Sequence, residues 1–114
     1  MEKILTIDGR QVKFKSTGAY LLRYKTQFQR DALQDIFKLQ DAVNKKGKLV
    51  NPSAIDLEVF FNLVWTLAKT ADPSIPPPME WLDTFNEFPI GDILPEVQDM
   101  IISTMSATEQ PKKK

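Results

Sequence analysis

The sequence contains no cysteine and no histidine. Without cysteine, the chain cannot form a disulfide, a thiolate metal site or a thiol nucleophile. Without histidine, it lacks both the commonest general base and the commonest metal ligand. Most catalytic templates are thereby excluded. We therefore expect a protein that is not an enzyme and that uses no cofactor, metal ion or catalytic residue.

Long apolar runs are missing as well. No stretch approaches the roughly 20 apolar residues that span a bilayer, and the apolar run that follows Met1 is too short for a signal peptide. These features favour a cytosolic protein without membrane contact. The 114 residues, of which 42% are apolar and 26% charged, are typical of one globular domain.

The charges are unevenly distributed although the net charge is zero. Residues 1–50 hold 11 Lys/Arg and 5 Asp/Glu, whereas residues 51–111 hold 10 acidic residues and a single base, Lys69. Such asymmetry favours contact between the halves or head-to-tail contact between copies, so we expect salt-sensitive self-association. Nucleic-acid binding is disfavoured, because the bases are scattered and the aromatic residues have core-like spacing.

The first residues predict a β-hairpin. Residues 3–7 and 11–15 flank Asp8-Gly9, the two-residue signal of a type I′ turn. In the register that this turn implies, one face of the hairpin is apolar and the other is polar. An isolated hairpin is not stable in water, so we expect its apolar face to pack on a helix. The side chains on that face are Leu5, Ile7, Val12 and Phe14.

A helical pattern follows, with Ser16 and Thr17 as possible N-caps. No proline or glycine interrupts residues 19–46, which predicts one long helix with a possible kink near Arg30 and Asp31. The apolar stripe of this helix consists of Tyr20, Tyr24, Phe28, Ala32, Ile36, Leu39 and Val43.

The second half of the chain predicts three further helices. The first starts at the N-cap Ser53, ends near Ala71 and is apolar enough to be central. The proline-rich residues 72–78 form an extended connector. A short helix at 79–88 and a last helix capped by Asp92 follow.

The predicted fold class is mainly α with an N-terminal β-hairpin, a small α+β fold in which a helical bundle packs on two strands. We expect a single domain over residues 1–105, and the lysine-rich tail at 106–114 is predicted to be disordered.

Two groups of residues are candidates for function. Paired acidic residues such as Glu80 and Asp83 are interpreted as charges in the first turns of helices, because no phosphate-binding loop or calcium-loop spacing accompanies them. Aromatic residues at helical spacing are more often core than binding surface, although tyrosine hydroxyls suit a half-wet surface. The candidate protein-binding residues are Tyr20, Tyr24, Phe28, Trp81 and Phe85.

Several segments together resemble a known family. Residues 5–17, which include the hairpin turn, are followed by Leu22-Arg23-Tyr24-Lys25 and Phe28-Gln29-Arg30-Asp31, and later by the segment 81–85 and the helix at 93–102. Over residues 3–105 the chain resembles the tail assembly chaperones of long-tailed phages and prophages of Gram-positive bacteria. The resemblance is one of composition and order, without a catalytic signature.

This resemblance implies a role during tail morphogenesis in the cytoplasm of the bacterial host. Such proteins bind the long, helical tape measure protein, keep it soluble and help recruit tail tube protein, and they are absent from the finished virion. The binding surfaces expected here are the outward sides of the helices at 20–28 and 79–88. The alternatives are a structural protein of the tail or head–tail junction, and a small regulator that binds nucleic acid.

In this family a longer form, which contacts the tube protein, typically arises by translational frameshifting near the end of the short reading frame. Residues 112–114 are consecutive lysines, whose codons can form the A-rich run on which ribosomes slip. The chain is accordingly interpreted as the short form.

Overall fold

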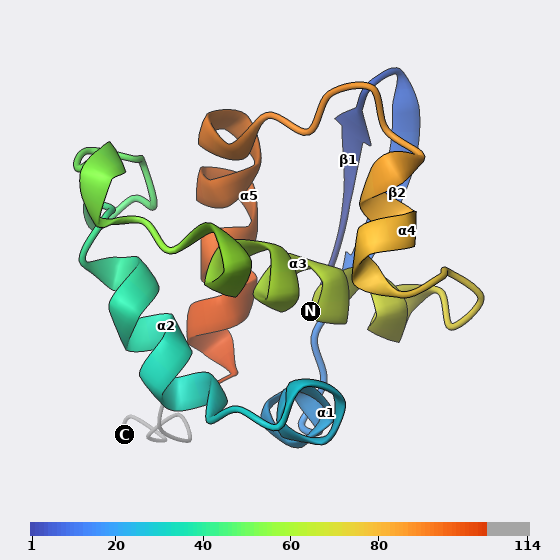
Figure 1. Ribbon diagram of the computed structural model, residues 1–114, viewed down its shortest axis with the longest axis horizontal. Helices are drawn as coiled ribbons and strands as arrows, with labels where there is room; N and C mark the ends of the chain where they lie inside the picture. Colours follow the sequence, from blue (N-terminus) through green and yellow to red (C-terminus); the bar gives the residue numbers. More distant parts are fainter. Residues whose placement is uncertain (105–114) are drawn as a thin grey trace, which may run out of the picture.

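The computed structural model describes residues 1–104. It is mainly helical with an N-terminal antiparallel hairpin, which confirms the predicted small α+β class (Figure 1). The predicted tail at 106–114, and the last residue of the predicted domain, lie outside the described residues. The elements are β1 (Glu2–Ile7), β2 (Arg10–Lys15), α1 (Tyr20–Phe28), α2 (Ala32–Gln40), the short 3₁₀ helix η1 (Pro52–Ala54), α3 (Leu57–Ala71), α4 (Pro78–Asp83) and α5 (Ile90–Ser103).

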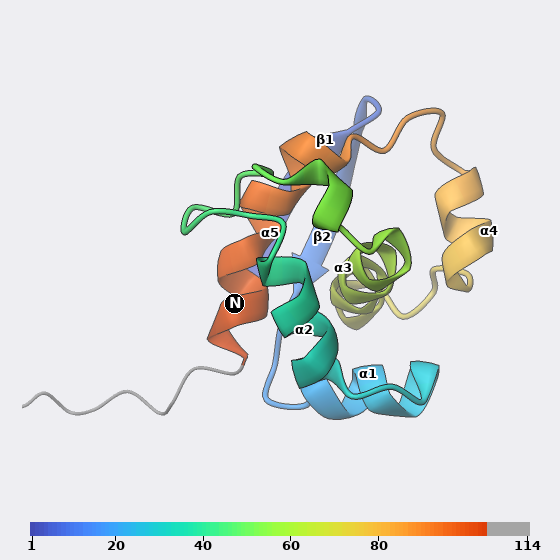
Figure 2. The same cartoon turned by 60° about the vertical axis from the view of Figure 1, so that its left-hand side comes forward.

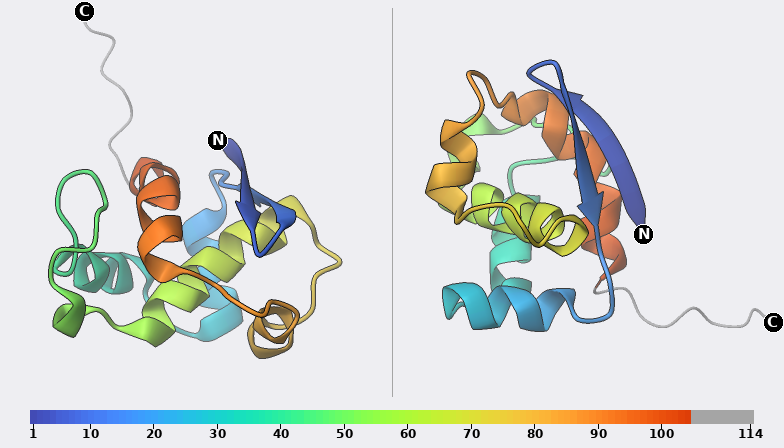
Figure 3. Two further views of the ribbon diagram at one scale, coloured as in Figure 1. Left: turned by 90° about the horizontal axis from the view of Figure 1, so that it is seen from above. Right: turned by 90° about the vertical axis from the view of Figure 1, so that its right-hand side faces the viewer.

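The hairpin has the predicted register, with Leu5 opposite Val12. Asp8 and Gly9 both have positive φ, as a type I′ turn requires. Ile7, Val12 and Phe14 are buried and Leu5 is half-buried, so the apolar face is the predicted one. That face packs on helices, as expected, since β2 contacts α3 and β1 contacts α5 (Figure 3).

Helix α3 is the centre of the molecule, as its composition predicts. Most of its side chains from Val59 to Ala68 are buried. Helices α1 and α2 pack on one side of it, and α4 lies on another (Figure 2). The predicted N-cap at Ser53 is wrong: Ser53 belongs to η1, and the carboxylate of Asp56 accepts a hydrogen bond from the Val59 N–H at 3.2 Å and caps α3.

The single long helix predicted for residues 19–46 is two helices, α1 and α2. Gln29 has a left-handed backbone, with φ 58°, and ends α1. The Asp31 carboxylate then accepts from the Leu33 N–H at 2.9 Å and starts α2. The expected kink site is therefore a complete break. Helix α2 ends at Gln40, because residues 41–50 form a loop in which the Asn44 side chain accepts two backbone N–H groups.

The two last helices differ in their bounds from the prediction. Helix α4 ends at Asp83 instead of residue 88, and α5 begins after Pro89, so Asp92 lies in the first turn of α5 and does not cap it. Side chains of α3 hold the proline-rich connector in place. The Trp65 indole N–H donates to the Pro76 carbonyl at 2.9 Å, and the Lys69 amine donates to the carbonyls of Pro73 and Ile75.

Candidate protein-binding surface

The five candidate binding residues belong to the interior of the fold. Tyr20 and Tyr24 are fully buried, Trp81 and Phe85 are buried, and Phe28 is half-buried against the core. Tyr20 and Tyr24 therefore do not form an outward binding stripe on α1. The physical reason is that both tyrosines satisfy their hydroxyl groups inside the fold, Tyr20 on α3 and Tyr24 on α2. The core interpretation of this spacing is therefore the one that the structure shows.

A buried hydrogen-bond network joins α1 to α2. The Tyr24 hydroxyl donates to Asp35 Oδ2 at 2.6 Å, and the Arg30 guanidinium donates to both Asp35 oxygens at 2.7 and 2.9 Å. Burial alone would raise the pKa of Asp35, but the bonds from Arg30 and Tyr24 outweigh it and hold that pKa below its usual value. Burial, together with the bond to Asp35, raises the pKa of Tyr24. This network fixes the angle between the two helices.

The second tyrosine ties α1 to α3. The Tyr20 hydroxyl donates to the Leu63 carbonyl at 2.8 Å, inside the core. Burial raises the pKa of this hydroxyl well above its usual value, so it stays a neutral donor.

Aromatic side chains fill the space between α3, α4 and the segment that leads to α5. Trp81 contacts Phe85 and Phe88 with ring centroids 5.2 and 5.6 Å apart, and Phe88 also contacts Phe60 and Phe61 of α3. These rings meet at tilted or edge-to-face angles, the arrangement that aromatic pairs prefer. Trp81 and Phe85 therefore hold α4 in place.

The hairpin turn covers this aromatic cluster. The Arg10 guanidinium lies 3.8 Å from the centre of the Phe85 ring and donates to the Thr84 carbonyl at 3.3 Å. The Asp8 carboxylate accepts from the Asn86 N–H at 2.9 Å. The turn residues thus pack the first elements of the chain against the segment between α4 and α5.

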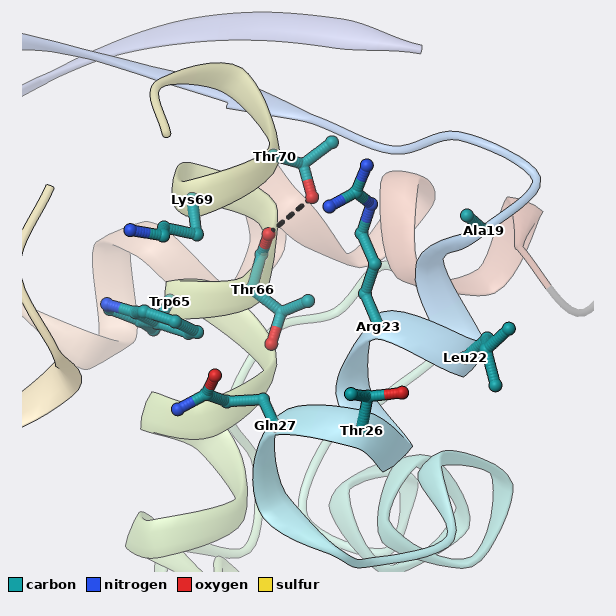
Figure 4. Close-up of a pocket in the computed structure, with 9 residues that line it drawn as sticks. All are labelled: Ala19, Leu22, Arg23, Thr26, Gln27, Trp65, Thr66, Lys69 and Thr70. Atoms are coloured by element: carbon teal, nitrogen blue, oxygen red, sulfur yellow. Dashed lines mark hydrogen bonds between the residues drawn. The ribbon is translucent and has the colours of Figure 1, made fainter. Parts of the chain in front are cut away.

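A groove of about 340 Å³ runs between α1 and α3 (Figure 4). Its lining includes two cations, Arg23 and Lys69, and no Asp or Glu. The Arg23 side chain points across the groove toward α3, close to Thr66 and Thr70 (Figure 4). The Thr70 hydroxyl donates to the Thr66 carbonyl at 2.7 Å, which leaves its oxygen as an acceptor. Because two cations and no acidic side chain line the groove, it is suited to binding anionic groups.

Apolar side chains are exposed on the outer sides of two helices. On α2, Leu33 and Phe37 are 38% and 54% exposed and lie one turn apart. On α1, Leu22 is 68% exposed at the groove. The helical phase of the sequence contains this signal, since these residues fall outside the stripe of Tyr20, Tyr24 and Ile36. The prediction missed these exposed residues because it selected the stripe, which is the buried side of the helices.

Within residues 1–104, no cluster of three or more His, Cys, Asp or Glu side chains is arranged to hold a metal ion. Over the same range, no helix has the length and apolar character needed to cross a membrane.

No protein-family model, curated protein sequence or solved structure matches this chain.

Proposed function

We propose that this chain is a tail assembly chaperone of a long-tailed phage, which binds helical segments of the tape measure protein and keeps them soluble in the host cytoplasm. In this role it also helps recruit tail tube protein, and it leaves before the virion is complete. The sequence resemblance over residues 3–105 supports the proposal, together with one observation on the surface. That observation is the exposed apolar pair Leu33 and Phe37 on α2.

The apolar pair suits a helical client. Phe37 is the one aromatic side chain among residues 1–104 that is more than half exposed, and Leu33 lies beside it at a spacing of four residues. An amphipathic helix binds through apolar residues at the same spacing. Full burial of one such side chain contributes about 1.5–3 kcal/mol. A single copy would therefore bind weakly and reversibly, whereas many copies along one long client would hold it in solution.

Co-expression with the tape measure protein of the same phage tests the proposal. We expect the wild-type chain to keep the tape measure protein soluble and to co-purify with it. The double substitution Leu33→Gln with Phe37→Gln is expected to abolish co-purification. A matched control is Ile4→Thr, which removes a side chain that is 55% exposed on the hairpin and keeps the strand propensity.

Two results would contradict the proposal. If the well-expressed wild-type chain neither binds nor solubilises the tape measure protein, the chaperone role is wrong. If mass spectrometry finds the chain as a stoichiometric component of purified virions, the structural-protein alternative replaces it.

The longer frameshifted form is part of the same proposal. The lysines at residues 112–114 motivate it. The gene is expected to carry a slippery heptamer at these codons and an overlapping downstream reading frame. A nucleotide sequence without both features would remove the frameshift from the proposal and leave the proposed binding role of this chain unchanged.

A further inference from the structure

The groove between α1 and α3 carries positive charge that no acidic side chain of its lining neutralises. Among residues 1–104, no group accepts a hydrogen bond from the Arg23 guanidinium, and no carboxylate lines the groove. The Lys69 amine donates to two carbonyls and lies 5.9 Å from the centre of the Trp65 ring. Since an ammonium group has three N–H donors, one of them makes no hydrogen bond. Leu22 adds an exposed apolar side chain at the same place. A matching partner presents carboxylates beside an apolar group.

The outer face of α4 has this composition. Glu80 and Met79 precede Asp83 by three and four residues, so each lies beside Asp83 on the outer side of the helix, while Trp81 faces the core. Met79 is 74% exposed, and Glu80 and Asp83 are exposed. Among residues 1–104, neither carboxylate forms a salt bridge, although the Arg10 guanidinium lies nearby against Thr84 and Phe85.

We propose that the α1–α3 groove of one copy binds the outer face of α4 of a second copy. Met79 packs against Leu22 at the groove, and the carboxylates of Glu80 and Asp83 meet the two cations. Such charge complementarity sets the orientation and the rate of the encounter more than the affinity. The contact needs no client.

The arrangement of the helices makes this contact a head-to-tail one. Helices α1 and α4 lie on different sides of α3, and Trp81 anchors α4 in its own copy (Figures 2 and 3). Each copy therefore presents one groove and one α4 face, which are different surfaces. Contacts between unlike surfaces produce rings or open chains of copies.

Two other occupants of the groove fit less well. The lysines at residues 112–114 have the same sign of charge as the groove, which argues against the chain's own end. Nucleic acid binds through exposed aromatic faces that stack on bases. Trp65, the aromatic residue that lines the groove, is buried and contacts Phe28 edge-on. The second copy remains the occupant that matches both the charge and the apolar group.

Sedimentation analysis of the full chain tests this contact. We expect oligomers at about 0.02 M salt that dissociate at about 0.5 M salt, where charges are screened. Arg23→Glu in the groove is expected to weaken association about ten- to hundredfold, since it places like charges together. The double substitution Glu80→Gln with Asp83→Asn removes the negative charge of the α4 face without reversing it, and it is also expected to weaken association. Lys25→Glu is the matched control, because Lys25 lies on α1 outside the groove, and it should assemble like the wild type.

Mixing the two defective proteins identifies the surfaces. The Arg23→Glu copy keeps an intact α4 face, and the double mutant keeps an intact groove, so the mixture is expected to form a dimer through one contact and nothing larger. Circular dichroism of each variant should show the wild-type helix content.

Several results would overturn the proposal. These are a wild-type chain that stays monomeric at low salt, an Arg23→Glu variant that assembles like the wild type, or a mixture that does not pair. Salt-dependent binding of an oligonucleotide that Arg23→Glu abolishes, in a chain that is monomeric, would assign the groove to nucleic acid instead. None of these results bears on Leu33 and Phe37, so failure here is distinguishable from failure of the chaperone role.

Discussion

The two sides of α3 are stabilised by different kinds of interaction. Toward α1 and α2, directional hydrogen bonds connect the elements, with Tyr24, Arg30 and Asp35 in one network. Toward α4, aromatic rings fill the space and make few hydrogen bonds, with Trp81 and Phe88 at the centre. The stability of the first side therefore depends on charge, and hence on pH, whereas the stability of the second side depends on side-chain volume.

The outer surfaces differ in the same way. The α1 side presents the cationic groove with Arg23, and the α4 side presents Glu80 and Asp83. A sequence of zero net charge is thus folded into a molecule with opposite charges on different sides of one helix. This polarity is the basis of the contact between copies that we propose.

The largest effect is expected on the aromatic side. Trp81→Ala should destabilise the fold by about 3–5 kcal/mol, because it leaves a cavity among Phe85, Phe88 and the hairpin turn. Denaturant unfolding measures this loss. Trp81→Phe, which keeps part of the volume, should lose less. Equal losses in the two variants would contradict the view that volume decides stability here.

A smaller effect is expected on the hydrogen-bonded side. Asp35→Asn should destabilise the fold by about 2–3 kcal/mol at neutral pH, since it removes a charged acceptor of three hydrogen bonds. Denaturant unfolding again measures the change. Asp99→Asn, on the exposed side of α5, is the matched control and should be close to neutral.

The same aspartate should make stability depend on pH. The pKa of Asp35 is lower in the folded chain than its ordinary value of about 4. Its stabilising contribution is therefore complete above that ordinary value and is lost as the pH falls through the folded pKa. We expect the difference in stability between wild type and Asp35→Asn to shrink in this acidic range. A difference that stays constant down to pH of about 2 would show that the carboxylate charge is not involved.

A still smaller effect is expected where the hairpin turn meets the aromatic cluster. Arg10→Ala should cost about 0.5–1 kcal/mol, because it removes the cation over Phe85 at a partly exposed site. Arg10→Lys keeps the charge and should recover part of the loss, and Lys13→Ala, on the same strand, serves as the control. Thermal unfolding of the three variants measures the order of their stabilities. If Arg10→Ala is as stable as the wild type, packing against the aromatic rings alone holds the hairpin turn in place.

The elements that sequence predicts well are those with local signals. The hairpin follows from Asp8-Gly9 and from alternating apolar residues, so the register is predictable. The break between α1 and α2 is not, because Gln29 is a residue that rarely takes a left-handed backbone. The contact of Asp35 with Tyr24 and Arg30 stabilises that break, and it forms only when the helices are already placed.

The candidate surface shows a related limit. An amphipathic stripe predicts which residues share a face, but the stripe of Tyr20 and Tyr24 is the face that the core takes. The exposed pair Leu33 and Phe37 lies outside this stripe, and tertiary packing alone decides that it stays uncovered. Sequence periodicity therefore predicts which segments are helical and which residues share a face. Which face stays exposed depends on how the helices pack in the fold.

The most direct test of the binding role is site-specific photo-crosslinking during co-expression with the tape measure protein. A photoreactive phenylalanine derivative replaces Phe37 in one variant and Ile4, on the hairpin, in another. The account expects a crosslinked product with the tape measure protein from position 37 and none from position 4. A crosslink from position 4 alone, or none from position 37 in a chain that still co-purifies with the tape measure protein, would contradict the assignment of α2 as the client-binding surface.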